Sequence, residues 1–213
     1  MKIKQFVFNH FGENTYVVID ETTSSCAIID PGCFRETEKQ TLVSFFKSNN
    51  LVPDKILFTH CHVDHTFGAH FLLEEYPLIQ TYAHQSEQHF IDTAVEQAES
   101  FGVTIDQPPA IAHYVYDGQT ITIGALEFKV ICTPGHSLGC VCYYNKENNI
   151  LFSGDTLFAN SVGRTDLYGS SHLSLMNSIQ EKLMVLPENT DVLPGHGPST
   201  TIGEEKNTNP YIQ

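Results

Sequence analysis

Four side chains that can bind metal lie within six residues of one another: His60, His62, Asp64 and His65. They follow the apolar segment 55–58, which predicts a strand that ends in a loop. Histidines two positions apart in an extended segment point the same way, so His60 and His62 can meet one metal ion. Asp64 and His65 belong to the next turn and face a second point in space. Imidazole and carboxylate groups suit zinc, iron or manganese, so the run predicts a metal site.

Three more residues of ligand type each end a predicted strand directly after a glycine: His136, Asp155 and His196. A single glycine of this kind only marks a turn. A glycine beside a ligand also lets the backbone turn sharply and come close to a bound ion. Because the arrangement occurs three times, we expect these residues to complete the site.

The pattern of apolar residues and turn signals predicts the elements that position these side chains. Strands are expected over 3–8, 14–20, 25–30, 55–60, 78–84, 111–116, 119–124, 126–133, 139–144, 149–155 and 190–197, and helices over 36–49, 68–75, 85–100 and 171–186. Asp117-Gly118 indicates a hairpin between strands 111–116 and 119–124. Two sheets with helices outside them fit this order, whereas a purely parallel doubly wound sheet does not fit such frequent hairpins.

Composition limits the partners. The chain has 213 residues, which suits one domain over 1–213. Its net charge of −14 leaves no Lys/Arg stripe for phosphates, so we expect no nucleic-acid partner. No apolar run approaches the roughly 20 residues of a membrane span, and the first eleven residues have no signal-peptide pattern. We therefore expect a cytoplasmic protein that does not bind membranes. Six cysteines are expected as free thiols: Cys26, Cys33, Cys61, Cys132, Cys140 and Cys142.

The complete ligand pattern resembles that of the metallo-β-lactamase superfamily. This resemblance implies an α+β fold, a four-layer αββα sandwich of two mixed sheets flanked by helices, with the metals at the sheet edge. It also implies two divalent metal ions, zinc first, with iron or manganese as alternatives. One would be held by His60, His62 and His136, the other by Asp64, His65 and His196, with Asp155 bridging them.

Within the superfamily, segments 14–16, 29–32, 163–166 and 195–200 are similar to short bacterial glyoxalase II-like hydrolases. That similarity implies hydrolysis of a small-molecule thioester such as S-lactoylglutathione. Asp64 and Asp155 would be the catalytic carboxylates, and Asp64 could also take the proton of the attacking water. Two departures concern glutathione. Asp166 replaces a tyrosine of glyoxalase II, and residues 197–213 replace a helical extension that supplies cationic contacts, so the thiol stays open.

Several residues have two interpretations. Asp30 either accepts the outer N–H of a ligand histidine or is a simple turn carboxylate. Arg164 either binds a substrate carboxylate or pairs with Asp166. The aromatic residues Phe90, Phe101 and Tyr168 either line the substrate entrance or are ordinary packing and surface residues.

Other functions remain open at this point. Persulfide dioxygenases resemble the chain but use one iron, and lactonases or phosphodiesterases use the same kind of site. A secreted-type β-lactamase has cysteine where this chain has Asp155, and flavodiiron proteins have glutamate at the position of His62. A non-catalytic relative would be expected to have lost ligands. The oligomeric state is not predicted.

Overall fold

The computed structural model describes residues 1–105 and 107–212, whose strands form two six-stranded sheets and a small ribbon. The first sheet has the order β1 (Lys2–Phe8), β2 (Glu13–Ile19), β3 (Ser25–Ile29), β4 (Val52–Leu57), β5 (Gln80–His84) and β6 (His113–Val115). Its pairs are antiparallel from β1 to β3 and parallel from β3 to β6. The sheet is therefore mixed, as expected.

The second sheet has the order β14 (Thr200–Thr201), β13 (Asp191–Pro194), β10 (Ile150–Gly154), β9 (Val141–Asn145), β8 (Leu126–Cys132) and β7 (Thr120–Ile123). Only β10 and β13 pair in parallel. The ribbon consists of β11 (Leu157–Phe158) and β12 (Ser161–Val162). The sequence patterns predicted neither the ribbon nor β14.

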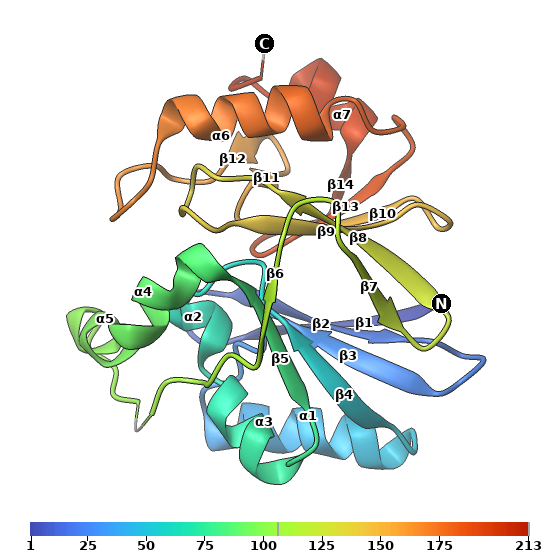
Figure 1. Cartoon of the computed structure of the whole chain (residues 1–213), viewed down its shortest axis with the longest axis vertical. Helices are drawn as coiled ribbons and strands as arrows, with labels where there is room; N and C mark the ends of the chain where they lie inside the picture. The colour runs from blue at the N-terminus through green and yellow to red at the C-terminus, as the bar shows by residue number, and fades with distance from the viewer. Residues whose placement is uncertain (106, 213) are drawn as a thin grey trace.

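Helices cover the outer face of each sheet (Figure 1). Below the first sheet lie α1 (Glu36–Ser48) and α3 (Ala69–Glu75), and above the second lie α6 (His172–Ser178) and α7 (Ile202–Thr208). Near one end of the sheets lie α2 (Val63–Thr66), α4 (Gln88–Asp92) and α5 (Ala94–Ser100). The predicted four-layer αββα sandwich is confirmed.

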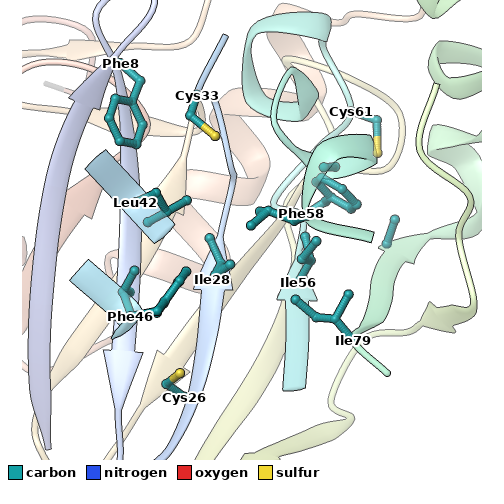
Figure 2. Packing of buried hydrophobic residues seen from close by; sticks show 14 of the residues in the cluster. Phe8, Cys26, Ile28, Cys33, Leu42, Phe46, Ile56, Phe58, Cys61 and Ile79 are labelled. Carbon is teal, nitrogen blue, oxygen red and sulfur yellow. The ribbon is translucent and has the colours of Figure 1, made fainter. Parts of the chain in front are cut away.

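Three apolar layers hold the sandwich together. Figure 2 shows the first, in which Leu42 and Phe46 of α1 pack over Ile28 and Ile56 of the first sheet. The second layer lies between the sheets, and the third lies between the second sheet and α6. The all-buried pattern of β2 arises because it lies between β1 and β3 and both of its faces are covered by apolar layers.

The two sheets are also joined by hydrogen bonds near one edge. The Tyr143 hydroxyl donates to the Phe58 carbonyl (2.9 Å), and the Val141 N–H donates to the Thr59 carbonyl (2.8 Å). On the other side, the Tyr16 hydroxyl and the Asn14 amide both donate to the Pro194 carbonyl, at 2.8 and 2.9 Å. These bonds tie the end of β4 to the second sheet and the end of β13 to the first.

One predicted hairpin is wrong. Asp117-Gly118 does not join two paired strands, because β6 pairs with β5 in the first sheet and β7 pairs with β8 in the second. The turn instead carries the chain from one sheet to the other. It is held there because the Gly118 N–H donates to the Val130 carbonyl (2.8 Å) and Asp117 accepts from the Cys132 N–H (2.7 Å). A positive φ of 79° at Gly118 suits such a turn as well as it suits a hairpin.

Two predicted helices are interrupted. The segment 85–100 divides into a 3₁₀ turn (Gln85–Glu87), α4 and α5, with Thr93 outside helical geometry. The segment 171–186 begins with Ser171 as N-cap, whose hydroxyl accepts from the Ser174 N–H, and after α6 it continues as a π-helical turn (Ile179–Leu183).

Other expectations concern thiols and membranes. All six cysteines are free, and all but Cys132 are buried. Within residues 1–105 and 107–212, no helix has the length and apolar character needed to span a bilayer.

The Asp20 carboxylate is a polar link between turns of the two sheets. It accepts from the Thr22 and Thr23 hydroxyls and from the Ala125 N–H beyond β7 (2.8 Å). These donors, the Ala125 N–H foremost, hold the pKa of Asp20 well below its usual range. Its contribution to stability is therefore present above the unfolded-state pKa of about 3.9 and is lost as pH falls below it.

We expect Asp20→Asn to lower the urea midpoint of the metal-free protein at pH 7 and to lower it less at pH 3. The reason is that the wild-type carboxylate loses its advantage as it becomes protonated in the unfolded state. Urea unfolding followed by circular dichroism at both pH values measures the difference. An equal loss at pH 7 and pH 3 would contradict the assigned role of the charge.

Candidate metal centre

Two groups of metal-binding side chains lie at one edge of the sandwich, where strands of both sheets end. In the first group, ligand atoms of His60, His62 and His136 all lie within 4.8 Å of one another. His60 and His62 come from the loop after β4, and His136 comes from the turn after β8. As predicted from their spacing, the two histidines of the loop after β4 belong to the same group.

In the second group, ligand atoms of Asp64, His65 and His196 meet the same distance limit of 4.8 Å. Asp64 and His65 lie on α2, which begins directly after His62, and His196 follows β13. His196 Nε2 lies 3.2 Å from Asp64 Oδ2, and His65 Nε2 lies 3.7 Å from the same oxygen. His65 also lies close to the first group, with 4.2 Å between its ring centroid and that of His60, and these two histidines form a further possible metal-binding set with Asp30.

Asp155 lies between the two groups, immediately after β10. Its Oδ1 atom is 3.5 Å from His65 Nε2, and its Oδ2 atom is 3.6 Å from His136 Nε2 and 3.7 Å from His196 Nε2. One carboxylate therefore faces histidines of both groups. All seven residues singled out in the sequence lie together at this edge.

The outer nitrogens of three histidines are anchored by the fold. His136 Nδ1 lies 2.9 Å from the Arg164 carbonyl, His196 Nδ1 lies 3.2 Å from the Phe11 carbonyl, and His65 Nδ1 lies 3.1 Å from Asp30 Oδ2. Because a carbonyl can only accept, Nδ1 of His136 and His196 must carry the proton. The tautomer so defined leaves Nε2 free to face the centre.

Of the two interpretations of Asp30, the structure favours the one in which it supports a ligand histidine. Its carboxylate accepts from the Thr59 N–H (2.8 Å) and hydroxyl (2.6 Å) and faces His65 Nδ1. Both oxygens thus hold the chain just before the metal-binding loop. Asp30 has a left-handed φ of 49°, a conformation that aspartate adopts more readily than most residues.

Three buried polar atoms at the centre have no hydrogen-bond partner: His60 Nε2, His62 Nε2 and Asp155 Oδ1. A buried polar atom without a partner costs about 1–3 kcal/mol, so native proteins rarely keep several in one place. An imidazole nitrogen and a carboxylate oxygen are both metal ligands. The residues present therefore fit divalent metal ions.

Burial and mutual charge set the protonation of the centre. Burial lowers the pKa of His62 to about 3, and burial together with the neighbouring histidines lowers the pKa of His60. For Asp64, burial raises the pKa, but the charge of His65 and the close approach of His196 outweigh it and hold the pKa below the usual range. At neutral pH His60 and His62 are therefore neutral imidazoles and Asp64 is a carboxylate, which are the forms that bind metal.

Gly195 is required by the close approach of the backbone to the centre. A Cβ atom at this position would lie 2.3 Å from Asp155 Oδ1 and 2.7 Å from His65 Cε1. Any side chain here would displace a residue of the centre. The close approach of the backbone to the centre therefore explains why a glycine precedes His196, as the sequence pattern suggested.

Comparison with known proteins places this centre in a family. The family model for the metallo-beta-lactamase superfamily matches residues 9–196, which include all seven residues. The chain belongs to this superfamily.

The superfamily relatives include proteins of full matching length. The chain is 35% identical to "Probable metallo-hydrolase YqgX" of Bacillus subtilis, over 100% of this chain and 98% of the relative. It is 29% identical to "Hydroxyacylglutathione hydrolase GloC" of Haemophilus influenzae, over 100% and 98%. The family and the metal-binding groups together identify a metal-dependent hydrolase of this fold.

Two solved superfamily structures have nearly the same fold. BLEG-1, described as a B3 metallo-beta-lactamase, has a TM-score of 0.89 and 37% identity, with both chains covered completely. TTHA1623, solved in a di-iron-bound form, has a TM-score of 0.87 and 36% identity, with 98% of this chain and 99% of that chain covered.

Glu87 also supports this metal centre, although it was not among the residues predicted for the site. In the sequence it looks like an ordinary acidic residue in the first turn of a helix. It is buried, with 1% of its surface exposed. Its Oε2 accepts from the Cys61 N–H (2.8 Å), between His60 and His62. Its Oε1 accepts from the Ser137 hydroxyl (2.6 Å) and the Gly139 N–H (2.8 Å), beside His136. One carboxylate thus fastens both loops of the first group.

We expect Glu87→Gln to weaken metal binding at the first group by about 10- to 100-fold, as is typical when a residue that orients ligands is lost. In the variant, an amide nitrogen would replace one carboxylate oxygen of Glu87. It would face an N–H or O–H donor, so that hydrogen bond would be lost. Competition with a chromophoric chelator measures the affinity of each bound ion. Glu205→Gln is the matched control, because Glu205 is also fully buried and accepts from Asn160, Thr200 and Asn209 on and around α7. An equal loss of affinity in both variants would refute the specific role of Glu87.

A pocket of about 570 Å³ opens in front of the centre. Its lining includes Asp155, four residues of the two metal groups, and the aromatic residues Phe90, Phe101 and Tyr168. Arg164 also lines the pocket, and its guanidinium forms a two-point ion pair with Asp166 (2.6 and 2.8 Å). The pairing alternative for Arg164 is therefore the one observed.

Proposed function

We propose that this metal-dependent hydrolase is a binuclear thioesterase of the glyoxalase II-like type, which cleaves S-2-hydroxyacyl thioesters. The observation that carries the proposal is the position of Asp155, which faces histidines of both metal groups at the base of the pocket. One carboxylate shared by two three-residue groups is the arrangement that a two-metal hydrolase needs.

The proposed ligands follow the two groups. His60, His62 and His136 would hold one ion, Asp64, His65 and His196 the other, and Asp155 both. Zinc is the first choice, and iron and manganese are the alternatives, because all three accept mixed nitrogen and oxygen ligands. The di-iron form of TTHA1623 supports iron as an occupant of a closely similar fold.

The chain's own residues prepare the reaction. When bound, the metal ions would lower the pKa of a water molecule and polarise the substrate carbonyl. Asp64 remains ionised, because His65 and His196 face it, and its carboxylate can accept the proton of the attacking water. The aromatic walls of the pocket exclude bulk water and hold the acyl thiol in place. A thiolate leaves without a proton, so no general acid is required opposite Asp64.

The thioester substrate is supported by two observations. One is the full-length similarity to GloC, whose name describes hydrolysis of hydroxyacylglutathione. The other is the pocket volume, which suits a small molecule. The full-length similarity to BLEG-1 supports a second candidate, hydrolysis of a β-lactam ring.

The test is to measure the metal content of the purified chain and its turnover of three probes. S-Lactoylglutathione tests the thioesterase, a chromogenic cephalosporin tests the β-lactamase, and glutathione persulfide with an oxygen electrode tests a dioxygenase. Close to two metal ions per chain and turnover of the thioester above both other probes would support the proposal. One iron per chain with oxygen uptake and no thioester turnover would overturn it.

A further inference from the structure

We propose that the pocket selects thioesters whose thiol part carries no negative charge, and that Asp166 enforces this choice by occupying Arg164. The reaction named here rests on the proposed thioesterase function. The charge selection rests on separate observations of the pocket lining, the ion pair and the charge of the chain.

The first observation is the shortage of cations in the pocket. Among the described residues that line it, those outside the metal-binding set are aromatic, aliphatic or neutral and polar, and Arg164 is the single Lys or Arg. Glutathione and similar thiols carry carboxylates, which proteins bind with Arg, Lys or backbone N–H groups. Among the lining residues, only Arg164 brings a full positive charge for that purpose.

The second observation is that this cation already has its carboxylate. Arg164 Nε lies 2.6 Å from Asp166 Oδ1 and Nη2 lies 2.8 Å from Asp166 Oδ2, so both oxygens are engaged by one fork of the guanidinium. The backbone at this position is fixed, because the Arg164 carbonyl accepts from His136 Nδ1 (2.9 Å). The ion pair therefore stands beside the metal centre, where a carboxylate of the substrate would compete with Asp166.

The third observation is the character of the walls. Phe11 and Phe101 form an edge-to-face pair (5.3 Å between centroids), and Phe90 and Tyr168 form another (6.2 Å). Phe101 and Tyr168 remain 48% and 63% exposed although each is a large ring. Rings exposed at the mouth of a pocket offer apolar contact area to a ligand rather than to the core.

The charge of the whole chain acts in the same direction. With 25 acidic and 11 basic residues, the net charge of −14 gives a field that repels anions at a distance. An uncharged thiol part pays no such penalty and gains contact with the aromatic walls.

The test uses two substrates that differ in one group. S-Lactoyl-N-acetylcysteine carries a carboxylate, and its carboxamide is neutral and nearly the same size. We expect the metal-loaded wild type to have a kcat/KM for the carboxamide about five-fold higher or more, since one unfavourable exposed charge is worth up to about that factor. Asp166→Asn should reduce this preference about five-fold, and Arg164→Gln should increase it.

A matched control separates local from general charge effects. Glu188→Gln removes one carboxylate from another exposed ion pair, with Lys206 (3.9 Å), and Glu188 is not among the residues that line the pocket. We expect the ratio of the two kcat/KM values to stay as in the wild type. A shift equal to that of Asp166→Asn would show that net charge alone sets the ratio and would overturn the assignment to Asp166.

Binding of two unreactive thioethers keeps the inference independent of hydrolysis. S-Benzyl-N-acetylcysteine and its carboxamide lack the thioester bond, so each can be titrated into the metal-loaded chain, and calorimetry gives the ratio of their Kd values. If neither thioester is hydrolysed, the proposed function fails, and the Kd ratio in the wild type and in Asp166→Asn still decides the charge selection. Tighter binding of the carboxylate by the wild type would mean that the substrate displaces Asp166, and it would overturn the inference.

Discussion

The Asp155→Asn variant is expected to lose thioester hydrolysis by about 10³-fold or more while keeping its fold. Asp155 faces His65, His136 and His196, so under the proposed function its carboxylate is placed to bind an ion in each metal group. Asparagine has nearly the same volume but offers one neutral oxygen, which cannot bridge two cations. Metal analysis of the variant should show less than the wild-type content, and steady-state kinetics measures the loss of turnover.

Asp191→Asn provides the matched control for this experiment. It makes the same chemical change at an exposed position at the start of β13, in the strand that leads to His196. We expect wild-type turnover and metal content in that variant. If Asp155→Asn instead kept the wild-type metal content and more than a tenth of the turnover, the bridging role of Asp155 would be wrong.

Removal of metal is expected to lower the melting temperature by about 8–16 °C. Binding at a thousand times Kd stabilises a fold by about 4 kcal/mol, and for a domain of this size each kcal/mol shifts Tm by about 2–4 °C. The structural reason is that His60 Nε2, His62 Nε2 and Asp155 Oδ1 are buried without a partner until an ion binds them. Calorimetry before and after treatment with a chelator measures the shift.

Restoring each metal in turn distinguishes this effect from damage by the chelator. Addition of zinc, iron(II) or manganese to the stripped chain should return the melting temperature, and the ion that raises it most at equal concentration binds most tightly. The same additions to Asp155→Asn should raise it less. A wild type that melts at the same temperature with and without metal would show that the three atoms do not bind an ion.

The metal centre was predictable because its signal is local. Four of its residues lie within six positions, and His136, Asp155 and His196 each follow a glycine at the end of a strand. Both a strand end and a glycine turn can be recognised from the local sequence. That these separate turns meet at one edge of the sandwich was not a matter of spacing. It came from the resemblance to a family, and the structure brings all seven residues together.

The parts that sequence did not predict depend on contacts between distant segments. Asp117-Gly118 looks the same whether it closes a hairpin or leads from one sheet to the other, since only the partners of β6 and β7 differ. Glu87 looks like a first-turn acid, because its three donors lie 26 to 52 positions away. The choice between the two roles of Arg164 likewise required its side-chain position relative to Asp166.

The hydrogen bonds between the sheets have a further consequence for the chemistry. Residues 60–65 extend from the first sheet, whereas His136, Asp155 and His196 extend from the second, so the relative position of the ligands depends on how the two sheets are held together. The hydroxyls of Tyr143 and Tyr16 bond to the opposite sheet and so help to hold the two halves of the centre in position from within the core. The integrity of the metal centre therefore depends on residues of the core that are not themselves ligands.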